Sequence, residues 1–524
     1  MISSSVPQLE KEALDSQSEH LRTDHLLHNI GQRAVSGGFV TVVAQAAKFV
    51  LTFAAAAILA RLLTPGEFGL VGMVLGVTGL VGVFNELGLS TATVQRQEIT
   101  QQQVSNLFWI NVAVSGVVSL ATCGLAPLLA KFYRDPRVTW IAVALSAMFI
   151  LTGSTVQHRA ILTRQMRFRA VAIIDVTSMF VGFSVACLLA WMGLAYWALV
   201  AQQLANALAC LVLIWWTSKW RPSLPRRNSG VRPLLSFGAH LTVADFVGRL
   251  SVNSDTVLIG RFFGAVPLGL YTRASVLLAR PLEQVFAPIN AVMDPVLARL
   301  QADPERYRRT FLRTFDALAM LVFPFAAICL ALSKPLVLLI LGPKWTDVIP
   351  LFGAFALVAI TSPLSSVVSW LYQSQGRGKD QLRSHTSAGL VTVLAYIVGL
   401  VWGPRGLIIS LAITSAAIRL PIVYYIAGRS GPVSTRDLWY SFVSQLPAWG
   451  TVYLATLLVR TAVSNSLPIV QVIVCTPVGL IIGGASLLLF RRFRENGLYA
   501  LSVVKSAVQQ WGERDVAKVS NFAD

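Results

Sequence analysis

Charged residues are the scarcest feature of this sequence. Asp, Glu, Lys and Arg make up only 13% of its 524 residues, whereas 55% are hydrophobic and the mean hydropathy is +0.64. A soluble domain carries about 25% charged residues. The composition therefore excludes a soluble domain and indicates a polytopic membrane protein built from long apolar segments.

Motifs that carry chemistry are also missing. The five cysteines are scattered through apolar segments without metal-ligand spacing, so we predict no disulfide and no metal site. The sequence contains no G-x-x-x-x-G-K-[ST] phosphate loop, no H-E-x-x-H and no G-x-S-x-G motif. The loops opposite the basic ones are too short to build an active site. We therefore predict a carrier that is not an enzyme and holds no cofactor.

Apolar segments and loop charges predict the topology. At about 20 residues per span, the sequence holds about fourteen membrane-spanning helices. Every second loop is basic, and the loop after the fourth span holds Arg159, Arg164, Arg167 and Arg169. Because Lys and Arg collect in cytoplasmic loops, topology explains the net charge of +19 better than nucleic-acid binding does. We predict that both termini are cytoplasmic.

One short stretch occurs twice. The segments "ARLLTPGEFGL" (60–70) and "GRFFGAVPLGL" (260–270) share Arg, Gly and Leu at matching places without a gap, and Gly69 thus corresponds to Gly269. The two copies end the first and the seventh predicted span, so they cross the membrane in the same direction. This pattern predicts a parallel repeat of two helix bundles.

The repeat sets the predicted fold class and domain organisation. We predict an all-α membrane protein in which two six-helix bundles are related by a pseudo-two-fold axis along the membrane normal, with two further carboxyl-terminal helices. The predicted parts are a cytoplasmic tail (1–32), an amino-terminal lobe with spans one to six (33–218), a basic cytoplasmic linker (219–235), a carboxyl-terminal lobe with spans seven to twelve (236–428), spans thirteen and fourteen (429–490) and a cytoplasmic tail with an interfacial helix (491–524).

Polar residues at helical spacing mark the predicted lining of a cavity between the lobes. A charge at the bilayer centre costs about 2.5 to 3.5 kcal/mol, so such residues usually face a bundle interior or water. The candidates for substrate binding are Gln45, Lys48, Arg249, Asn253, Arg273 and Arg280, and the candidates for ion coupling, by a proton or by sodium, are Glu86, Asp245 and Asp255. Because Asp245 and Arg249 are four residues apart, a structural ion pair is the alternative for Asp245. The excess of cations predicts an anionic substrate such as a phosphate or diphosphate, which arginine binds in a forked geometry.

Several longer segments carry a resemblance to a known family. They are "ILARLLTPGEFGLVGM" (58–73), "NELGLSTATVQRQEIT" (85–100), "LAPLLAKFYRDPRV" (125–138), "NSDTVLIGRFFGAVPLGLYTRA" (253–274) and "LGPKWTDVIPLF" (341–352). In order and spacing they resemble the polysaccharide transporters of the multidrug/oligosaccharidyl-lipid/polysaccharide (MOP) exporter superfamily. The similarity is greatest to the lipopolysaccharide biosynthesis branch, with its O-antigen and colanic-acid flippases.

The resemblance implies a function, a location and partners. It implies a flippase of the bacterial inner membrane that moves an undecaprenyl-diphosphate-linked oligosaccharide to the periplasmic leaflet for exopolysaccharide, capsule or O-antigen synthesis. Transport would proceed by alternating access of two lobes around a cationic cavity. The implied partners are the lipid-linked oligosaccharide, membrane lipids and a polysaccharide polymerase, but no nucleic acid. Asp255 and Tyr271 match recurrent positions of the family.

Two alternatives remain open. The first is a cation-coupled drug or metabolite antiporter of the same superfamily, in which Glu86 would be the coupling carboxylate. The second is a membrane enzyme that polymerises or ligates polysaccharide, which the short outer loops disfavour. Fold analogy alone does not decide between substrates.

Overall fold

A computed structural model of the chain describes residues 30–85, 88–96, 99–225, 242, 246, 249–250 and 253–488. Within these ranges all regular elements are helices and no strand occurs. Eleven helical segments of this part are long and apolar enough to cross a membrane. One of these segments, Gly378–Gly428, folds back on itself, and Gly399 therefore lies against Leu407. The predicted all-α membrane fold is confirmed, and the count of fourteen spans stays a prediction.

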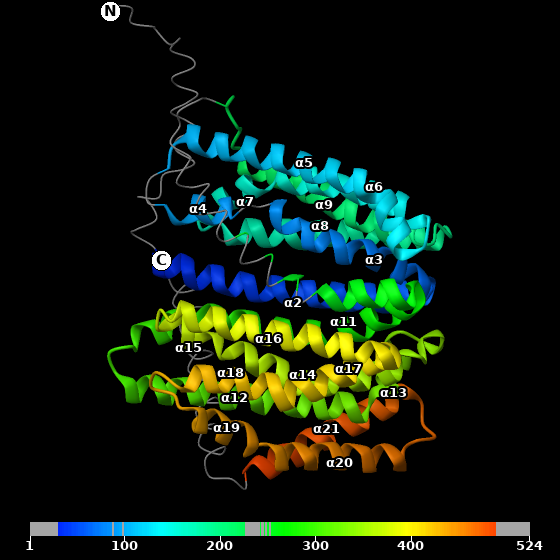
Figure 1. Ribbon diagram of the computed structural model, residues 1–524, viewed down its shortest axis with the longest axis vertical. Helices are drawn as coiled ribbons and strands as arrows, with labels where there is room; N and C mark the ends of the chain where they lie inside the picture. Colours follow the sequence, from blue (N-terminus) through cyan, green and yellow to red (C-terminus); the bar gives the residue numbers. More distant parts are fainter. Residues whose placement is uncertain are drawn as a thin grey trace, which may run out of the picture. The chain divides into compact units, whose positions relative to one another are not determined.

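The chain divides into two compact units, and the first consists of Met1–Arg273 together with Leu341–Trp345. Its described helices are α2 (Ile30–Leu62), α3 (Pro65–Val81), η2 (Gly82–Asn85), α4 (Leu89–Gln95), α5 (Gln101–Tyr133), α6 (Arg137–Gly153), α7 (Val156–Arg164), α8 (Phe168–Trp191), α9 (Trp197–Ser218), a helix over 253–263, the start of α11 (Ala265–Arg299) and η3 (Pro343–Trp345). Within this unit α5 packs along α6, and α8 packs along both α2 and α9 (Figure 1).

Local sequence explains where α3 and α5 begin. Pro65 is the first residue of α3, a position where its missing N–H is not needed, and the backbone N–H of Thr64 donates to Glu67 Oε2 at 2.6 Å. At the start of α5, Thr100 N donates to Gln103 Oε1 at 3.1 Å and Gln103 N donates to Thr100 Oγ1 at 3.2 Å. This reciprocal pair is a capping box, which satisfies donors that the helix leaves open.

The second unit consists of Ala274–Ile340 together with Thr346–Asp524. Beyond the rest of α11, its described helices are α12 (Pro304–Ala331), α13 (Ser333–Ile340), α14 (Val348–Val367), α15 (Ser369–Ser374), α16 (Gly378–Gly399), η4 (Leu400–Trp402), α17 (Gly403–Thr414), the π-helical turn η5 (Ser415–Arg419), α18 (Leu420–Gly428), α19 (Thr435–Val443), α20 (Leu446–Ala462) and α21 (Pro468–Leu488). α12 packs against α14 and α20, and α20 packs along α21 (Figure 1). The forked ion pair of Arg308 with Asp437, at 2.9 and 2.5 Å, ties α12 to α19.

The two copies of the repeated stretch contact each other. A Cβ added at Gly69 would lie 1.7 Å from the carbonyl oxygen of Ala265, and one added at Gly269 would lie 1.8 Å from that of Pro65. The two contacts are reciprocal, because Gly69 is equivalent to Gly269 and Pro65 to Ala265, each pair 200 positions apart, as a two-fold relation between equivalent segments requires. Glycine is needed at both places because the backbones of α3 and α11 leave no room for a side chain.

A second correspondence, offset by 210 positions, relates helices of the two units. Arg167 precedes α8 and donates to Thr217 O, and Arg377 precedes α16 and donates to Ala427 O. Each arginine thereby links the start of one helix to the end of a later one. The turns before the two arginines also correspond, since Met166 and Gly376 have positive φ angles of 54° and 66°. These local features correspond between the two units, and the parallel repeat of two six-helix bundles stays a prediction.

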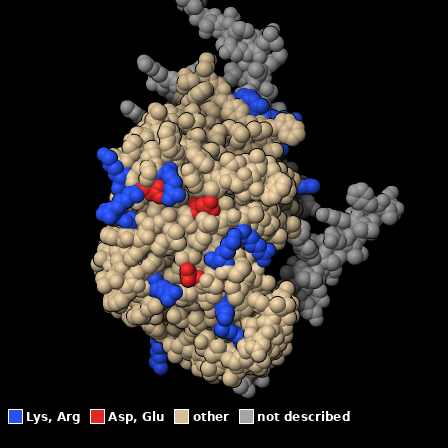
Figure 2. All heavy atoms as spheres, turned by 90° about the vertical axis from the view of Figure 1, so that its right-hand side faces the viewer, with Lys and Arg blue, Asp and Glu red and all other residues tan. Residues whose placement is uncertain are grey.

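The surface of the described helices suits a lipid environment. Large apolar side chains are widely exposed, among them Trp140 (67%) and Trp216 (77%). On the face shown in Figure 2, Lys and Arg side chains lie in small groups between wide uncharged areas, with few Asp and Glu. Exposed apolar area of this extent is expected where helices contact lipid chains.

Some predicted features lie outside the described residues. They include nearly all of the amino-terminal tail, most of the basic linker, and the interfacial helix in 491–524. The boundary between the units falls at Arg273 and Ala274, whereas the sequence places the boundary of its lobes in 219–235. The limits of the predicted lobes stay predictions.

Candidate functional site

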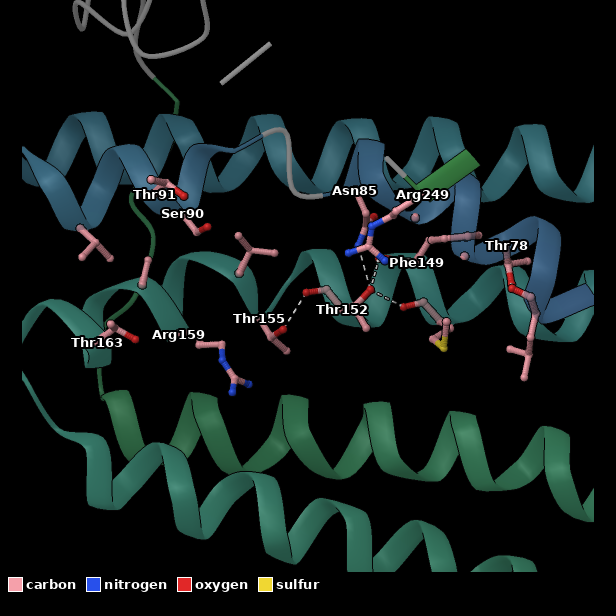
Figure 3. A pocket seen from close by; sticks show the side chains of 17 residues that line it. Thr78, Asn85, Ser90, Thr91, Phe149, Thr152, Thr155, Arg159, Thr163 and Arg249 are labelled. Atoms are coloured by element: carbon pink, nitrogen blue, oxygen red, sulfur yellow. Dashed lines mark hydrogen bonds between the residues drawn. The ribbon is translucent and has the colours of Figure 1, made fainter. Parts of the chain in front are cut away.

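The first unit contains a cavity of ≈ 660 Å³ (Figure 3). Hydroxyl side chains dominate its polar lining, which comes from α3, α4, α6, α7 and the connections between them. The lining hydroxyls are Thr78, Ser90, Thr91, Thr152, Thr155 and Thr163. The charged lining residues are Arg159 and Arg249. Hydroxyl groups both donate and accept hydrogen bonds, and guanidinium groups attract anions, so the cavity suits a polar, negatively charged ligand.

The cavity lies where two helices of the first unit are interrupted. α3 passes into the 3₁₀ turn η2, which ends at Asn85, and α6 ends at Gly153 before α7 begins at Val156. The side-chain amide of Asn85 and the hydroxyl of Thr152 are hydrogen-bonded at 2.8 Å and connect the two interruptions. Broken helices recur at the binding sites of membrane transporters, because their ends present polar groups inside the membrane.

Arg159 belongs to a cluster of three charged residues from three helices. Asp175 Oδ2, on α8, accepts hydrogen bonds from Lys48 Nζ of α2 at 2.6 Å and from Arg159 Nη2 of α7 at 2.8 Å. Arg159 is the member of this cluster that lines the cavity. The carboxylate thus balances one of two cations that converge from neighbouring helices.

Arg249 and Asn253, both predicted as substrate-binding residues, lie in the first unit. Figure 3 shows Arg249 beside Asn85 and Thr152 in the lining of the cavity. Asn253 Nδ2 donates to the carbonyl oxygen of Arg249 at 3.0 Å, and its Oδ1 faces Gly79, a lining residue, at 3.8 Å from a Cβ built there. Arg249 therefore lines this cavity and Asn253 lies beside a lining residue, while the role of both in substrate binding stays a prediction.

The other predicted binding residues lie elsewhere. Gln45 and Lys48 are half-buried on α2 and do not line the cavity, although Lys48 reaches it through Asp175 and Arg159. Arg273 lies over the ring of Phe68, with its guanidinium carbon 4.3 Å from the ring centroid. This cation–π contact places Arg273 next to the contact between the repeated stretches.

Arg280 forms an ion pair with Glu283 at 2.8 Å, three residues along α11. Both side chains are more than half exposed, so this pair contributes little to stability. The role of Arg280 in substrate binding stays a prediction.

Of the predicted ion-coupling residues, only Asp255 is described. Its carboxylate accepts a hydrogen bond from the Tyr271 hydroxyl at 2.6 Å and two from Thr256, which connects the helix over 253–263 to α11. Asp255 and Tyr271, the two residues that the resemblance singles out, are thus hydrogen-bonded to each other. Glu86 and Asp245 lie outside the described residues.

Sequence reasoning did not identify Arg159 and Asp175. Arg159 counted as one of four arginines in a basic loop, but it lies on α7, within a helical segment long enough to span the membrane. Asp175 stands alone in the apolar run "AVAIIDVTSMF". A single acid inside a membrane span is a signal that could have identified it.

The sequence matches a family model over residues 58–350, whose description is "polysaccharide biosynthesis protein". It is 24% identical over 373 residues to the lipopolysaccharide biosynthesis protein WzxC of Escherichia coli (strain K12), covering 71% of this chain and 76% of that protein. It is 26% identical over 351 residues to the teichuronic acid biosynthesis protein TuaB of Bacillus subtilis (strain 168), covering 67% and 73%. It is 27% identical over 333 residues to the succinoglycan biosynthesis transport protein ExoT of Rhizobium meliloti (strain 1021), covering 63% and 67%.

Two solved structures share the fold. The lipid II flippase MurJ in an inward closed conformation matches with a TM-score of 0.67 and 13% identity, over 87% of this chain and 99% of that one. An inward-facing multidrug resistance transporter of the MATE family matches with a TM-score of 0.56 and 16% identity, over 75% and 95%. The chain therefore has the helical fold of these two membrane transporters. By its sequence, the chain belongs to the polysaccharide biosynthesis protein family.

Proposed function

We propose that this protein is a flippase that moves an undecaprenyl-diphosphate-linked oligosaccharide from the cytoplasmic to the periplasmic leaflet of a bacterial inner membrane. The observation that carries the proposal is a cavity inside a membrane-spanning unit that combines hydroxyl groups with two guanidinium groups. The guanidiniums would bind the diphosphate in a forked geometry, and the hydroxyls would bind the first sugars. Membership of a polysaccharide biosynthesis family supports a glycan-bearing cargo.

The size of the cavity limits which part of the cargo it would hold. At ≈ 660 Å³ it falls within the range of sites for small molecules, about 300 to 1,000 Å³. It would therefore receive the diphosphate and the adjoining sugars, while the isoprenoid chain stays in lipid. We propose that Arg249, Asn253 and Arg159 form this part of the site. Lys48, Gln45, Arg273 and Arg280 stay predicted contacts of the remaining cargo.

Transport would follow from alternating access of the two lobes predicted from the sequence, with both termini in the cytoplasm and a polysaccharide polymerase receiving the product. Glu86, Asp245 and Asp255 stay the candidates for ion coupling. None of these features requires a cofactor or a covalent intermediate, because moving a lipid between leaflets changes no bond in it.

The test is mass spectrometry of isoprenoid-linked lipids in a strain depleted of this protein, with surface polysaccharide measured in parallel. We expect a lipid-linked oligosaccharide to accumulate and surface polymer to disappear. In a strain without a second flippase, an unchanged lipid pool with normal polymer would favour the cation-coupled antiporter.

Complementation of the depleted strain tests the residues. Arg249→Ala is expected to give full-length protein in the membrane but no surface polymer, and the sequence predicts the same for Arg280→Ala. Arg137→Ala is the matched control, because Arg137 pairs with Asp135 in a loop and does not line the cavity. Normal polymer from correctly inserted Arg249→Ala and Arg280→Ala variants would refute the cationic site.

A further inference from the structure

The carboxylate of Asp175 already holds the place that an anionic ligand would take on Arg159. Its Oδ2 accepts from both Lys48 and Arg159, and the side chains are 16%, 28% and 44% exposed for Asp175, Lys48 and Arg159. Exposure thus rises from the acid to the cation that lines the cavity. A ligand that enters meets Arg159 first, already paired with Asp175.

This arrangement makes binding an exchange of anions. The carboxylate of Asp175 partly neutralises Arg159, because its Oδ2 accepts hydrogen bonds from both Arg159 and Lys48. Arg159 therefore attracts a ligand with its full charge only if its ion pair with Asp175 is weakened. Asp175 is attached to the same unit, so its effective concentration at Arg159 is far above that of any free anion. A ligand with a single negative charge would replace one anion by another and gain little.

A diphosphate differs from such a ligand in charge. It carries more than one negative charge and several acceptor oxygens, so it could attract Arg159 and Lys48 together with Arg249, which also lines the cavity. The surrounding bilayer supplies a large excess of lipids whose headgroups carry a single phosphodiester charge. A cationic cavity without a counter-anion would be filled by these lipids.

We propose that Asp175 determines which anionic lipids bind, because as the resident counter-anion of Arg159 and Lys48 it excludes singly charged phosphodiester headgroups and yields only to a diphosphate. This inference rests on the proposed function, because it assumes that the cavity binds the headgroup of the cargo. In this role Asp175 makes the protein selective by lowering its affinity for singly charged headgroups, and it does not raise the affinity for the diphosphate.

The experiment measures lipid binding to the purified full-length protein by native mass spectrometry, with undecaprenyl diphosphate and phosphatidylglycerol as competing probes and phosphatidylcholine as the neutral reference. For the wild type we expect a clear preference for undecaprenyl diphosphate over phosphatidylglycerol. Asp175→Asn should increase phosphatidylglycerol binding by about tenfold, the effect of one unmasked charge-assisted hydrogen bond, and so reduce that preference. Asp175→Glu keeps the charge and should restore the preference.

Two further variants keep the test decisive. Asp380→Asn is the matched control, since Asp380 also pairs with two arginines but belongs to the second unit and does not line this cavity, and it should leave the preference unchanged. If Asp175→Asn does not fold, Lys48→Gln combined with Asp175→Asn removes the unpaired lysine and still unmasks Arg159. It should show the same gain in phosphatidylglycerol binding.

The outcomes separate the two proposals. A wild type that prefers undecaprenyl diphosphate, with an unchanged preference in a folded Asp175→Asn variant or in the double variant, would overturn the role of Asp175 and leave the flippase proposal intact. A wild type without any preference for undecaprenyl diphosphate would overturn the proposed cargo site itself.

Discussion

The starts of α8 and α16 are built alike, yet each unit places its acid differently. In both, an arginine before the helix donates to a carbonyl at the end of a later helix, Arg167 to Thr217 and Arg377 to Ala427. In the second unit Asp380 stands three residues after its arginine. The corresponding position in the first unit is Ala170, and the acid stands five residues further on, at Asp175.

The neighbours of the two acids show what the shift changes. Arg377 binds Asp380 and also donates to three backbone carbonyls, those of Ile426, Ala427 and Ser430, so its guanidinium closes the end of α18. Arg429 completes this cluster as the second partner of Asp380. The contacts of this second cluster thus connect the start of α16 to the end of α18.

The acid of the first unit is in a different position. Five residues move Asp175 about 7 Å deeper along its helix. At this position Asp175 forms ion pairs with Lys48 and Arg159, and Arg159 lines the cavity. The same local arrangement thus supports a cluster that ties helix ends together in one unit and a cluster with a cavity-lining arginine in the other.

The largest loss of stability is expected from replacing a glycine that the two repeated stretches share. Gly69→Ala would place a Cβ 1.7 Å from the carbonyl oxygen of Ala265, and neither backbone can yield without moving its helix. We expect a loss of about 3 kcal/mol or more in stability, enough to remove most folded protein. Size-exclusion chromatography of the full-length protein in detergent measures this loss.

The matched control for this variant is Gly116→Ala on α5, where no atom lies within 4 Å of the added Cβ. It should elute like the wild type. Equal amounts of folded protein from both variants would show that the contact between the repeats is dispensable.

The second prediction converts the first unit to the pattern of the second. Ala170→Asp combined with Asp175→Ala returns the acid to three residues after Arg167, so the fold should persist while Lys48 and Arg159 lose their shared anion. We expect transport to fall at least about tenfold, because singly charged lipids then compete for the cavity. Surface polysaccharide in the depleted strain measures it. Full transport by this variant would mean that the position of the acid does not matter.

The sequence predicted the fold better than the site. Hydropathy and loop charge predicted the helical membrane architecture, because each span must satisfy its backbone hydrogen bonds internally and the apolar runs reveal it. The repeat could be predicted because a close backbone crossing needs glycine at Gly69 and Gly269, and such a requirement leaves a mark in the sequence. The 210-position correspondence was not visible, since it rests on hydrogen bonds from two arginine side chains to backbone carbonyls and on φ angles rather than on a continuous run of identities.

The site was predicted only in part because spacing along one helix does not show which helices meet. Arg249 and Asn253 were selected from helical periodicity; Arg249 lines the cavity, and Asn253 lies next to the lining residue Gly79. Lys48 was assigned to the substrate, but its partner Asp175 lies 127 positions away in the sequence. No pattern within one helix could show this pairing.

The third prediction concerns the cluster at the start of α16. Asp380→Asn removes the acid that holds Arg377 and Arg429, while the bonds of Arg377 to backbone carbonyls remain. We expect a lower midpoint of thermal unfolding but normal transport per folded molecule. Thermal unfolding of the purified protein, with surface polymer normalised to protein in the membrane, measures both. A loss of transport at unchanged stability would show that the second cluster also serves the cargo.

The smallest effect is expected from an acid in the loop between α5 and α6. Asp135 accepts hydrogen bonds from the backbone and the side chain of Arg137, and chiefly the side-chain bond holds the pKa of Asp135 below its usual value. Because Arg137 is 55% exposed, Asp135→Asn should cost no more than about 1 kcal/mol at neutral pH.

The pH dependence of this pair follows from the lowered pKa. The folded protein binds the Asp135 proton less readily than the unfolded chain, so the pair stabilises the fold at neutral pH and stops doing so as the pH falls through the lowered pKa. Wild type and Asp135→Asn should therefore differ slightly at about pH 7 and converge towards about pH 3 in thermal unfolding. A difference that grew on acidification would contradict the assigned pairing. The stability change of Asp135→Asn thus gives a reference value for an ion pair with an exposed arginine. The larger effects expected from the changes at Asp380 and Asp175 can be compared with this value.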